Sequence, residues 1–394
     1  MKNKPNNVIN SDAKKLRRSF LTMQLFVASY VALSYSCNTV VPEPVSTNHS
    51  VAKRPKPAWH TIYMLGYLIG HMGSAFSGAL DPTPPVGSAA ILRACWTPKD
   101  LKETRAERAI IKPLTPDTNP PIRLIPESGT SKTTSAPGRS IRRVALPNGQ
   151  KIVALTFDLC EQAVEKTGYD GAIVDYLRAH QIKATFFAGG KWMRSHSKRT
   201  MQLMADPLFE VGNHAWTHGN LRVMRGDEMR NQIVWTQAQY EILWEGLQKS
   251  RCAINAGTQE MNRIPRLPRV FRFPYGACST ESLQATAQLG LDAIQWNIVT
   301  ADSVRGQTAR AIADTILNHV TPGSIVIAHA NGRGWHTAAA LAIAIPELQK
   351  RGYEFATVSE LLARGTPIAE DTCYELKPGD NKRYDRLFGN GTGL

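Results

Sequence analysis

The chain has few cysteines, and their arrangement does not indicate a zinc finger. Six occur among 394 residues, without a CxxC pair, at positions 37, 95, 160, 252, 278 and 373. A series of long hydrophobic runs along the chain and a Gly-X-Y repeat are also missing, while 42% of the residues are apolar and 20% are charged. This composition excludes a collagen-like chain, a polytopic membrane protein and a fully disordered chain. A disulfide such as Cys252–Cys278 is permitted in an exported protein, but the spacing does not assign the pairing.

Positive charge is abundant but unevenly distributed. The formal net charge is +15, a value that by itself would point to nucleic acid. Residues 1–150 hold 20 Lys and Arg against 8 Asp and Glu, together with 16 of the 24 prolines, whereas residues 151–394 hold 27 against 24. The sequence therefore has a basic, proline-rich forepart before a nearly neutral body. No folded basic face is implied, and no nucleic acid partner is expected.

The forepart carries two segments that look like export signals. Basic residues within 14–18 precede an apolar run over 20–36, and a second basic cluster within 53–56 precedes another apolar run over 61–80. This order of charged and apolar residues is typical of a secretory signal, with a short membrane anchor or an amphipathic surface helix as the alternatives. We expect residues 1–80 to be an export signal or membrane-anchor region. The protein would then be periplasmic, associated with the cell envelope, or secreted.

Composition divides the rest of the chain into a linker, a body and a tail. Proline pairs and a Ser/Thr-rich stretch predict that residues 81–149 form a linker with too little apolar surface to order itself, apart from a short helix within Ala89–Arg108. The body is expected over residues 150–363, and a C-terminal tail over residues 364–394. The segment before the body is thus expected to be largely unstructured.

Short β-branched apolar runs alternate with helical stretches through the body, which is typical of βα units around a parallel sheet. The predicted strands are Ile152–Phe157, Ala184–Ala188, Phe209–Gly212, Val270–Phe273, Ala293–Trp296 and Ile325–Ala328. The predicted helices are Asp170–Ala179, Asp227–Leu247, Thr280–Leu289, Ala309–Asn318 and Thr337–Arg351. About seven such units indicate an α/β fold that closes in the manner of a barrel.

Polar side chains follow five of these strands where each strand ends: Asp158, His214, Arg272, Asp302 and His329. The carboxyl ends of the strands of a parallel barrel converge on one face, and catalytic residues lie on that face. We therefore expect these five side chains to form one catalytic site.

The residue types at these positions indicate a metal and a supported carboxylate. His214 and His218 are four residues apart, and on a helical turn both imidazoles would face the same way, as a pair of zinc ligands does. Asp158 leaves a buried strand, so its carboxylate needs a partner that offsets the cost of burial. Arg272 can hold that carboxylate ionised and oriented.

The last strand ends at a histidine with a carboxylate available to it. His329 is placed to donate a proton, and Asp302 can hold its ring and raise its basicity. The loop that follows, GRGWH at 332–336, is punctuated by glycines and lies on the same face. It could close over a substrate, contribute His336 as another ligand, or be an ordinary solvated loop.

Five motifs in order resemble the polysaccharide deacetylases of carbohydrate esterase family four, the NodB-homology domain: ALTFD (154–158), NHAWTH (213–218), FRFPYG (271–276), WNIVTAD (296–302) and IVIAH (325–329). The resemblance covers about residues 150–363. It implies a distorted (β/α)7 barrel and a divalent metal, commonly zinc. It also implies hydrolysis of an acetyl group, usually from N-acetylglucosamine in chitin or peptidoglycan and sometimes from O-acetylated xylan.

The resemblance further implies a role for each matched residue. Asp158 would be the general base, positioned by Arg272, and His214 and His218 would bind the metal. The backbone N–H of Tyr275 would stabilise the oxyanion.

On the leaving-group side, His329 would protonate the departing amine, and Asp302 would tune that histidine.

The sequence departs from the family pattern beside Asp158. The family has a second aspartate there as the third metal ligand, whereas this chain has Leu159, which cannot bind a metal. The two histidines and waters could hold the zinc, Glu161 or the thiolate of Cys160 could fill the place, or the site could be inactive. Cys160 could equally be a packed thiol.

The substrate side of the pattern also differs. Val299 stands where an aspartate is common, and Ser303 stands where an aromatic residue lines the sugar pocket. Trp296, Trp335 or Trp216 could stack on a sugar instead, or belong to the core.

The sequence as a whole predicts an exported metal-dependent hydrolase that removes acetyl groups from an N-acetylated polysaccharide. Because Leu159 cannot bind a metal, a catalytically impaired carbohydrate-binding barrel is one alternative. An esterase acting on O-acetylated xylan is the other.

Overall fold

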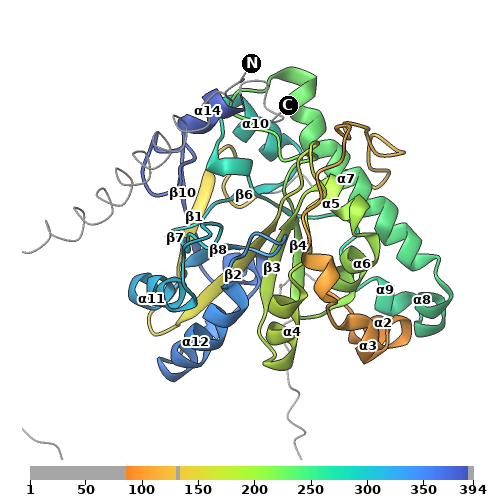
Figure 1. The fold of residues 1–394 in the computed structure, drawn as a ribbon, viewed down its shortest axis with the longest axis horizontal. Helices are drawn as coiled ribbons and strands as arrows, with labels where there is room; N and C mark the ends of the chain where they lie inside the picture. Colours follow the sequence, from red (N-terminus) through yellow and green to blue (C-terminus); the bar gives the residue numbers. More distant parts are fainter. Residues whose placement is uncertain (1–85, 130–133, 389–394) are drawn as a thin grey trace, which may run out of the picture. The chain divides into compact units, whose positions relative to one another are not determined.

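The computed structural model describes residues 86–129 and 134–388, and one curled sheet lies at their centre (Figure 1). Its hydrogen-bonded strands follow the order β10 (Thr366–Glu370), β1 (Ser140–Ala145), β6 (Asp292–Ile294), β5 (Val270–Phe271), β4 (Phe209–Asn213), β3 (Ala184–Ala188), β2 (Ile152–Leu159), β8 (Ile325–His329) and β7 (Ile298–Val299). A further strand, β9 (Glu354–Phe355), pairs with β2 outside this path. The ladders are parallel except for the antiparallel one between β1 and β10.

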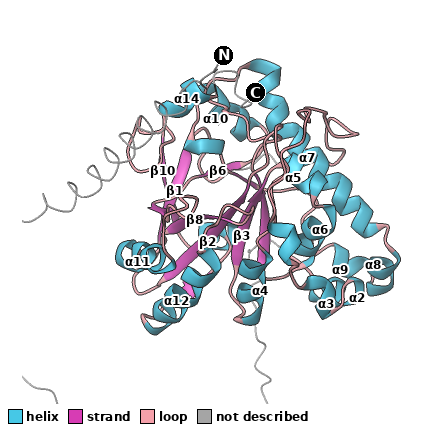
Figure 2. Ribbon diagram, viewed as in Figure 1, coloured by secondary structure: helices cyan, strands magenta, loops and turns pink. Residues whose placement is uncertain are grey.

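Helices surround these strands, as Figure 2 shows. The five predicted helices are present as α4 (Gly171–Ala179), α7 (Gly226–Gln248), α10 (Thr280–Gln288), α11 (Ala309–His319) and α12 (Thr337–Lys350). Shorter ones between or after them are α5 (Gly190–Ser195), α6 (Ser197–Ala205), α8 (Arg251–Ala256), α9 (Thr258–Met261), η2 (Pro274–Gly276), α13 (Val358–Ala363) and α14 (Arg383–Leu387). The predicted α/β class and distorted barrel are confirmed, because the parallel strands are enclosed by helices while the ladder runs from β10 to β7 without closing.

The core lies on both faces of the central strands. All eight residues of β2 are buried, as expected for a parallel strand that is covered on both sides. Phe157 on β2 stacks on Phe186 of β3 with 5.3 Å between ring centroids, and Phe186 meets the edge of Phe209 on β4 at 5.2 Å. This packing fixes the strand ends on which the polar residues stand.

Residues 86–129, which fall in the predicted linker over 81–149, pack onto the body. They carry α2 (Ala89–Cys95), α3 (Pro98–Leu101) and the 3-10 helix η1 (Arg105–Arg108) in place of one short helix. The hydroxyl of Ser88 accepts the N–H of Ile91 at the start of α2, and the Ile91 side chain is fully buried in the main core. A disulfide joins Cys95 to Cys252. The helix cap, the burial of Ile91 and the disulfide therefore order this segment. Its proline content alone would predict an unstructured linker.

The predicted tail over residues 364–394 also contributes structure in its described part. Its strand β10 pairs with β1 at the edge of the sheet, and Cys373 forms a disulfide with Cys278. The two disulfides thus use Cys252 and Cys278 with other partners, and not with each other. Cys160 is the free cysteine of the described residues.

The predicted export signal or anchor over residues 1–80 lies outside the described residues. Across 86–129 and 134–388, no helix combines the length and the hydropathy that a membrane span needs.

Candidate active site

The five polar strand-end residues lie together at one edge of the sheet. Asp158 near the end of β2 is in register with His329, the last residue of β8. His214 directly follows β4, and Arg272 directly follows β5, the neighbour of β4 in the sheet. Asp302 comes three residues after β7, which pairs with β8. Parallel pairing of strands far apart in sequence therefore assembles the predicted set.

Asp158 is held by the guanidinium of Arg272. Nη1 of Arg272 donates to Oδ1 of Asp158 at 2.8 Å, and both side chains are almost completely buried. The other guanidinium nitrogens face the backbone carbonyls of Ile294 and Gln295 at 3.4 and 3.3 Å. The plane also lies over the Phe187 ring, 4.0 Å from its centroid. This enclosure fixes one carboxylate oxygen of Asp158 and leaves Oδ2 facing His214 at 3.5 Å.

The histidine pair is presented by a loop and not by the helical turn that the spacing indicates. Residues 214–218 have no helical assignment, and Ala215 and His218 have left-handed φ values of 64° and 56°. The side-chain oxygen of Gln232 on α7 accepts the backbone N–H groups of Thr217 and Gly219 at 3.0 and 3.2 Å. The two imidazoles nevertheless meet, with ring centroids 4.9 Å apart.

The tautomer of His214 is set by a backbone carbonyl. Nδ1 of His214 lies 2.8 Å from the carbonyl oxygen of Arg272, so Nδ1 carries the proton and donates it. Nε2 is left with a lone pair directed at the side chains of Asp158 and Cys160, each 3.5 Å away. Metal-binding histidines typically have this arrangement, with the second nitrogen donating to a carbonyl.

Three side chains here could hold a cation. Ligand atoms of Cys160, His214 and His218 all lie within 4.8 Å of one another, and the three residues are buried. Nδ1 of His218 is buried without a hydrogen-bond partner among the described residues. Cys160 also belongs to a second group of this kind with Asp158 and His329. The residues present therefore fit a divalent metal.

Glu161, the acidic ligand suggested by the sequence, is committed elsewhere. Its Oε1 accepts from Nζ of Lys191 at 2.8 Å and from the hydroxyl of Ser195 at 2.6 Å, and its Oε2 accepts the N–H of Thr167 at 3.0 Å. It is absent from both metal-competent groups of the described residues. Leu159 is fully buried in the main core. The structure therefore places the carboxylate of Glu161 in a buried ion pair with Lys191 and not with the two histidines.

His329 is bound to Asp302 through both its ring and its backbone. Nδ1 of His329 lies 2.8 Å from Oδ1 of Asp302, and its N–H donates to Oδ2 at 2.7 Å. The hydroxyl of Thr337, the first residue of α12, also donates to Oδ2 at 2.7 Å. Gly334 leaves the necessary space, since a Cβ at that position would collide with the carbonyl oxygen of His329.

The protonation preferences of the histidines differ. Burial lowers the pKa of His214, although Asp158 opposes the shift, and burial with help from His214 lowers the pKa of His218. Burial also disfavours the charged form of His329, but the carboxylate of Asp302 outweighs it and raises the pKa of His329. Burial and then Asp158 raise the pKa of Cys160. His214 and His218 are thus suited to be neutral ligands, and His329 to carry a proton.

Tyr275 and Trp296 line the cleft in front of these groups. Tyr275 has a left-handed φ of 59°, and its ring packs on His218 at 4.5 Å between centroids. Its hydroxyl accepts from Nε2 of Gln162 at 2.6 Å. Trp296 is 3% exposed, and its indole N–H donates to the carbonyl of Glu375 at 3.2 Å. Tyr275 therefore borders the metal-competent group, and Trp296 forms part of the cleft wall.

The other candidates for sugar stacking lie elsewhere. Trp216 is buried and packs edge-on against Trp235, so it belongs to the core. Trp335 and His336 line a neighbouring groove of about 740 Å³, where the guanidinium of Arg305 lies over the indole of Trp335 at 4.6 Å. His336 is not part of either metal-competent group in the described residues.

The C-terminal segment builds one wall of the cleft, which the sequence analysis did not anticipate. Glu375, Arg383 and Tyr384 line a hollow of about 250 Å³ together with Asp158, His218, Tyr275, Asp302 and His329. Nη2 of Arg383 donates to Oε2 of Glu375 at 2.9 Å, and the rings of Tyr384 and Tyr275 are 5.0 Å apart. Cys373 was the available signal, because a disulfide to Cys278 draws this segment toward the FRFPYG motif.

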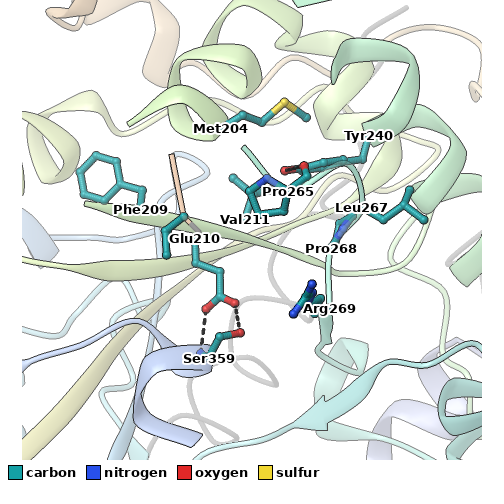
Figure 3. A pocket seen from close by; sticks show the side chains of 11 residues that line it. Met204, Phe209, Glu210, Val211, Tyr240, Pro265, Leu267, Pro268, Arg269 and Ser359 are labelled. Carbon is teal, nitrogen blue, oxygen red and sulfur yellow. Dashed lines mark hydrogen bonds between the residues drawn. The ribbon is translucent and has the colours of Figure 1, made fainter. Parts of the chain in front are cut away.

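A second, narrow cavity of about 20 Å³ lies at the opposite end of β4 (Figure 3). Glu210 faces it, and its carboxylate accepts the hydroxyl of Thr185 at 2.9 Å and both the N–H and the hydroxyl of Ser359. Its lining lacks histidine and cysteine, and most of it is apolar. Its small volume and mostly apolar lining are typical of a packing feature.

Comparisons with known proteins identify the family of the chain. The family model described as polysaccharide deacetylase matches residues 145–294. The chain is 30% identical over 218 residues to the peptidoglycan-N-acetylglucosamine deacetylase of Bacillus cereus, covering 55% of this chain and 70% of that protein. It is 29% identical over 202 residues to the chitooligosaccharide deacetylase of a Bradyrhizobium species, covering 48% and 82%.

A similar solved structure is that of a CE4 family pseudoenzyme from Bacillus anthracis, with 26% identity over 58% of this chain and 70% of that chain, and a TM-score of 0.45. The sequence relatives carry the assignment, since the Bacillus cereus deacetylase is matched over more than two thirds of its length. The chain belongs to the polysaccharide deacetylase family and is a deacetylase of the hydrolase class.

Proposed function

We propose that the protein is an exported, zinc-dependent enzyme that removes acetyl groups from N-acetylglucosamine in a cell-wall glycan. The observation that carries this proposal is that a carboxylate held by Arg272 lies within 4.8 Å of an imidazole held by Asp302. A buried histidine pair lies beside the carboxylate. Amide hydrolysis needs a base for water on one side and an acid for the amine on the other, and this arrangement provides both.

His214 and His218 are the residues that would hold the zinc. A divalent cation bound there supplies a Lewis acid and lowers the pKa of a coordinated water. His214 is oriented for this task by its bond to the carbonyl of Arg272, and His218 has a buried ring nitrogen without a partner in the described part of the chain.

Asp158 is the proposed general base. The guanidinium of Arg272 occupies Oδ1, so Oδ2 is the oxygen that is free to accept a proton from the attacking water. Because Arg272 is fully buried, its charge acts on Asp158 with little solvent screening, and its hydrogen bond orients the carboxylate.

The remaining steps fall to Tyr275 and His329. The backbone N–H of Tyr275 would donate to the oxygen that becomes negative when water adds to the acetyl carbonyl. His329, protonated and held by Asp302, would give its proton to the sugar nitrogen as the C–N bond breaks. The products are acetate and an amino sugar.

Two further observations support the substrate and the compartment. The relatives named above are a peptidoglycan-N-acetylglucosamine deacetylase and a chitooligosaccharide deacetylase. The Cys95–Cys252 and Cys278–Cys373 disulfides form in oxidising compartments, where cell-wall glycans are found. A membrane anchor within residues 1–80 stays part of the proposal.

Acetate release by the full chain tests the proposal. Zinc-loaded protein is incubated with peptidoglycan, acetylated chitooligosaccharides and acetylated xylan, and acetate is measured with and without prior chelation. We expect release from the two N-acetylated glycans, loss of release after chelation, and recovery with zinc. Asp158→Asn should lower kcat/KM by about 10²- to 10⁴-fold, the usual contribution of a general base.

Two results would contradict the proposal. Binding of an acetylated glycan without any acetate release would make the protein a carbohydrate-binding barrel. Release from xylan alone would make it an O-acetyl esterase.

A further inference from the structure

We propose that the thiolate of Cys160 is the third protein ligand of the zinc, in the place where the family pattern has a carboxylate. This inference rests on the proposed function for the presence of the metal, but it concerns the ligand set alone. It would make the site a Cys-His-His centre, built from residues 160, 214 and 218.

The direction of the β2 strand explains why Cys160, and not its neighbours, reaches the site. Successive side chains of a strand point to opposite faces. Asp158 faces the cleft and Leu159 is fully buried in the core, so the next side chain on the cleft side is that of Cys160. Cys160 directly follows the strand, and it continues this alternation because its backbone is held in place.

The backbone of Cys160 is held from two sides. Its carbonyl oxygen accepts the hydroxyl of Thr167 at 2.6 Å and the side-chain amide of Asn331 at 2.9 Å. Asn331 belongs to the loop that follows His329. The sulfur is thus placed by hydrogen bonds from two different segments before any metal binds.

The distance between Cys160 and His214 fits zinc. Sγ of Cys160 lies 3.5 Å from Nε2 of His214. Zinc bonds of about 2.3 Å to sulfur and about 2.0 Å to nitrogen, at a tetrahedral angle, separate the two ligand atoms by about 3.5 Å. His214 already directs a lone pair toward the sulfur, because its other nitrogen donates to the carbonyl of Arg272.

His218 supplies an independent indication of a ligand. One of its ring nitrogens is buried without a partner in the described residues, and its ligand atom lies within 4.8 Å of those of Cys160 and His214. An unpartnered buried polar atom costs stability unless something binds to it. A cation that His218 binds through this nitrogen would satisfy that atom.

Competing third ligands are engaged elsewhere. Glu161 is bound by Lys191, Ser195 and Thr167. Asp158 uses one oxygen for Arg272, and its other oxygen is the proposed base. The exchange of a carboxylate for a thiolate has a chemical consequence, since thiolates favour zinc over magnesium, calcium and manganese, which prefer oxygen ligands.

The test is the metal environment of the full chain and three variants. Zinc-loaded protein is measured by X-ray absorption, and cobalt-loaded protein by its near-ultraviolet thiolate-to-metal charge-transfer band. The variants are Cys160→Ser, Cys160→Asp and the matched control Cys37→Ser, which changes a cysteine outside the described residues. Folding of each variant is checked by circular dichroism.

We expect one sulfur neighbour at about 2.3 Å with nitrogen or oxygen neighbours at about 2.0 to 2.1 Å. Cys160→Ser should lose the charge-transfer band and weaken zinc binding by at least about 10-fold. Loss of a residue that only hydrogen-bonds to a metal ligand already costs about that much affinity, and loss of a ligand should cost more. Cys160→Asp should lose the band and retain zinc, and Cys37→Ser should resemble the unchanged protein.

A zinc shell without sulfur, or unchanged zinc affinity in Cys160→Ser, would overturn this inference. If acetate release still depended on zinc in that case, the proposed function would stand without it. Protein that neither binds zinc nor releases acetate would refute the proposed function as well. If Cys160→Ser failed to fold, the absorption spectrum of the unchanged protein would decide alone.

Discussion

Asp302 binds His329 at two points. Its Oδ1 lies 2.8 Å from the ring Nδ1, and its Oδ2 accepts the backbone N–H at 2.7 Å. The backbone bond fixes where the carboxylate lies, and the ring bond then fixes the imidazole. Because Asp302 is buried, its charge on that ring is weakly screened. The same residue therefore sets both the orientation of His329 and its affinity for a proton.

Asp302→Asn should shift the pH dependence of deacetylation. Asp302 raises the pKa of His329 against the opposing effect of burial, so its removal lowers that pKa. A general acid works while it is protonated, and activity falls as the pH rises through its pKa. The fall in kcat should therefore begin at lower pH in the variant, so its loss of activity should grow as the pH rises. A pH profile with an unchanged alkaline limb would contradict this role.

Arg272→Met should destabilise the protein through Asp158. Both side chains are buried, and removing one partner of such a pair typically costs about 3 to 5 kcal/mol, because the other charge is left uncompensated. The double variant Arg272→Met with Asp158→Asn should recover a large part of this loss. Urea denaturation of the unchanged protein, both single variants and the double variant measures the coupling. Additive effects would show that the pair does not act as a unit.

The Cys278–Cys373 disulfide should affect substrate binding as well as stability. It draws residues after Cys373 toward the cleft, where Arg383 and Tyr384 form part of the wall. Replacing both cysteines by serine should lower stability by about 2 to 4 kcal/mol and raise KM more than it lowers kcat.

The Cys95–Cys252 pair is the matched control, because it ties residues 86–129 to the body and none of those residues lines the cleft. Its removal should lower stability and leave KM unchanged. Equal changes of KM in both double variants would refute a specific role of the C-terminal wall.

His196 should make the fold sensitive to acid. Burial lowers the pKa of His196 to about 4, and its ring stacks on Trp192 with 4.6 Å between centroids. The histidine takes up a proton near pH 6.5 in the unfolded chain but only near pH 4 in the folded one. The free energy of unfolding is therefore unaffected above pH 6.5 and decreases as the pH falls toward 4. The loss is about 3 kcal/mol.

His196→Phe keeps a ring on Trp192 but cannot titrate. The difference in unfolding free energy between this variant and the unchanged protein should therefore vary between pH 7 and pH 4.5, in favour of the variant at low pH. A difference that is constant with pH would assign the acid sensitivity to other groups.

The sequence predicts the centre of this fold well because the central strands have a strong pattern. The runs before Asp158 and His329 are almost entirely apolar, which is typical of strands in a covered parallel sheet. The edges of the fold could not be predicted in the same way. β1 and β10 are stabilised by pairing with each other, and α2 depends on the buried Ile91 and the Cys95–Cys252 bond, contacts that no local pattern contains.

Part of the candidate site could also be predicted from the sequence, and part could not. Strand ends predict which side chains meet, so Asp158, Arg272 and His329 could be placed together from the sequence. The route of the loop from His214 to His218 depends on left-handed backbone at Ala215 and on Gln232, which is far along the chain. Such tertiary contacts replace the helical turn that the spacing indicates.

The two disulfides also determine how the protein would bear a mechanical load. Tension applied between a point before Cys95 and a point after Cys373 passes through the Cys95–Cys252 bond, along residues 252–278, and out through the Cys278–Cys373 bond. Residues 96–251 and 279–372 form closed loops beside that path and are not part of the covalent connection that bears the load. Asp158, both histidines of the pair and His329 lie in those loops, so an enzyme tethered at one end could be pulled while most of its site stays unstretched.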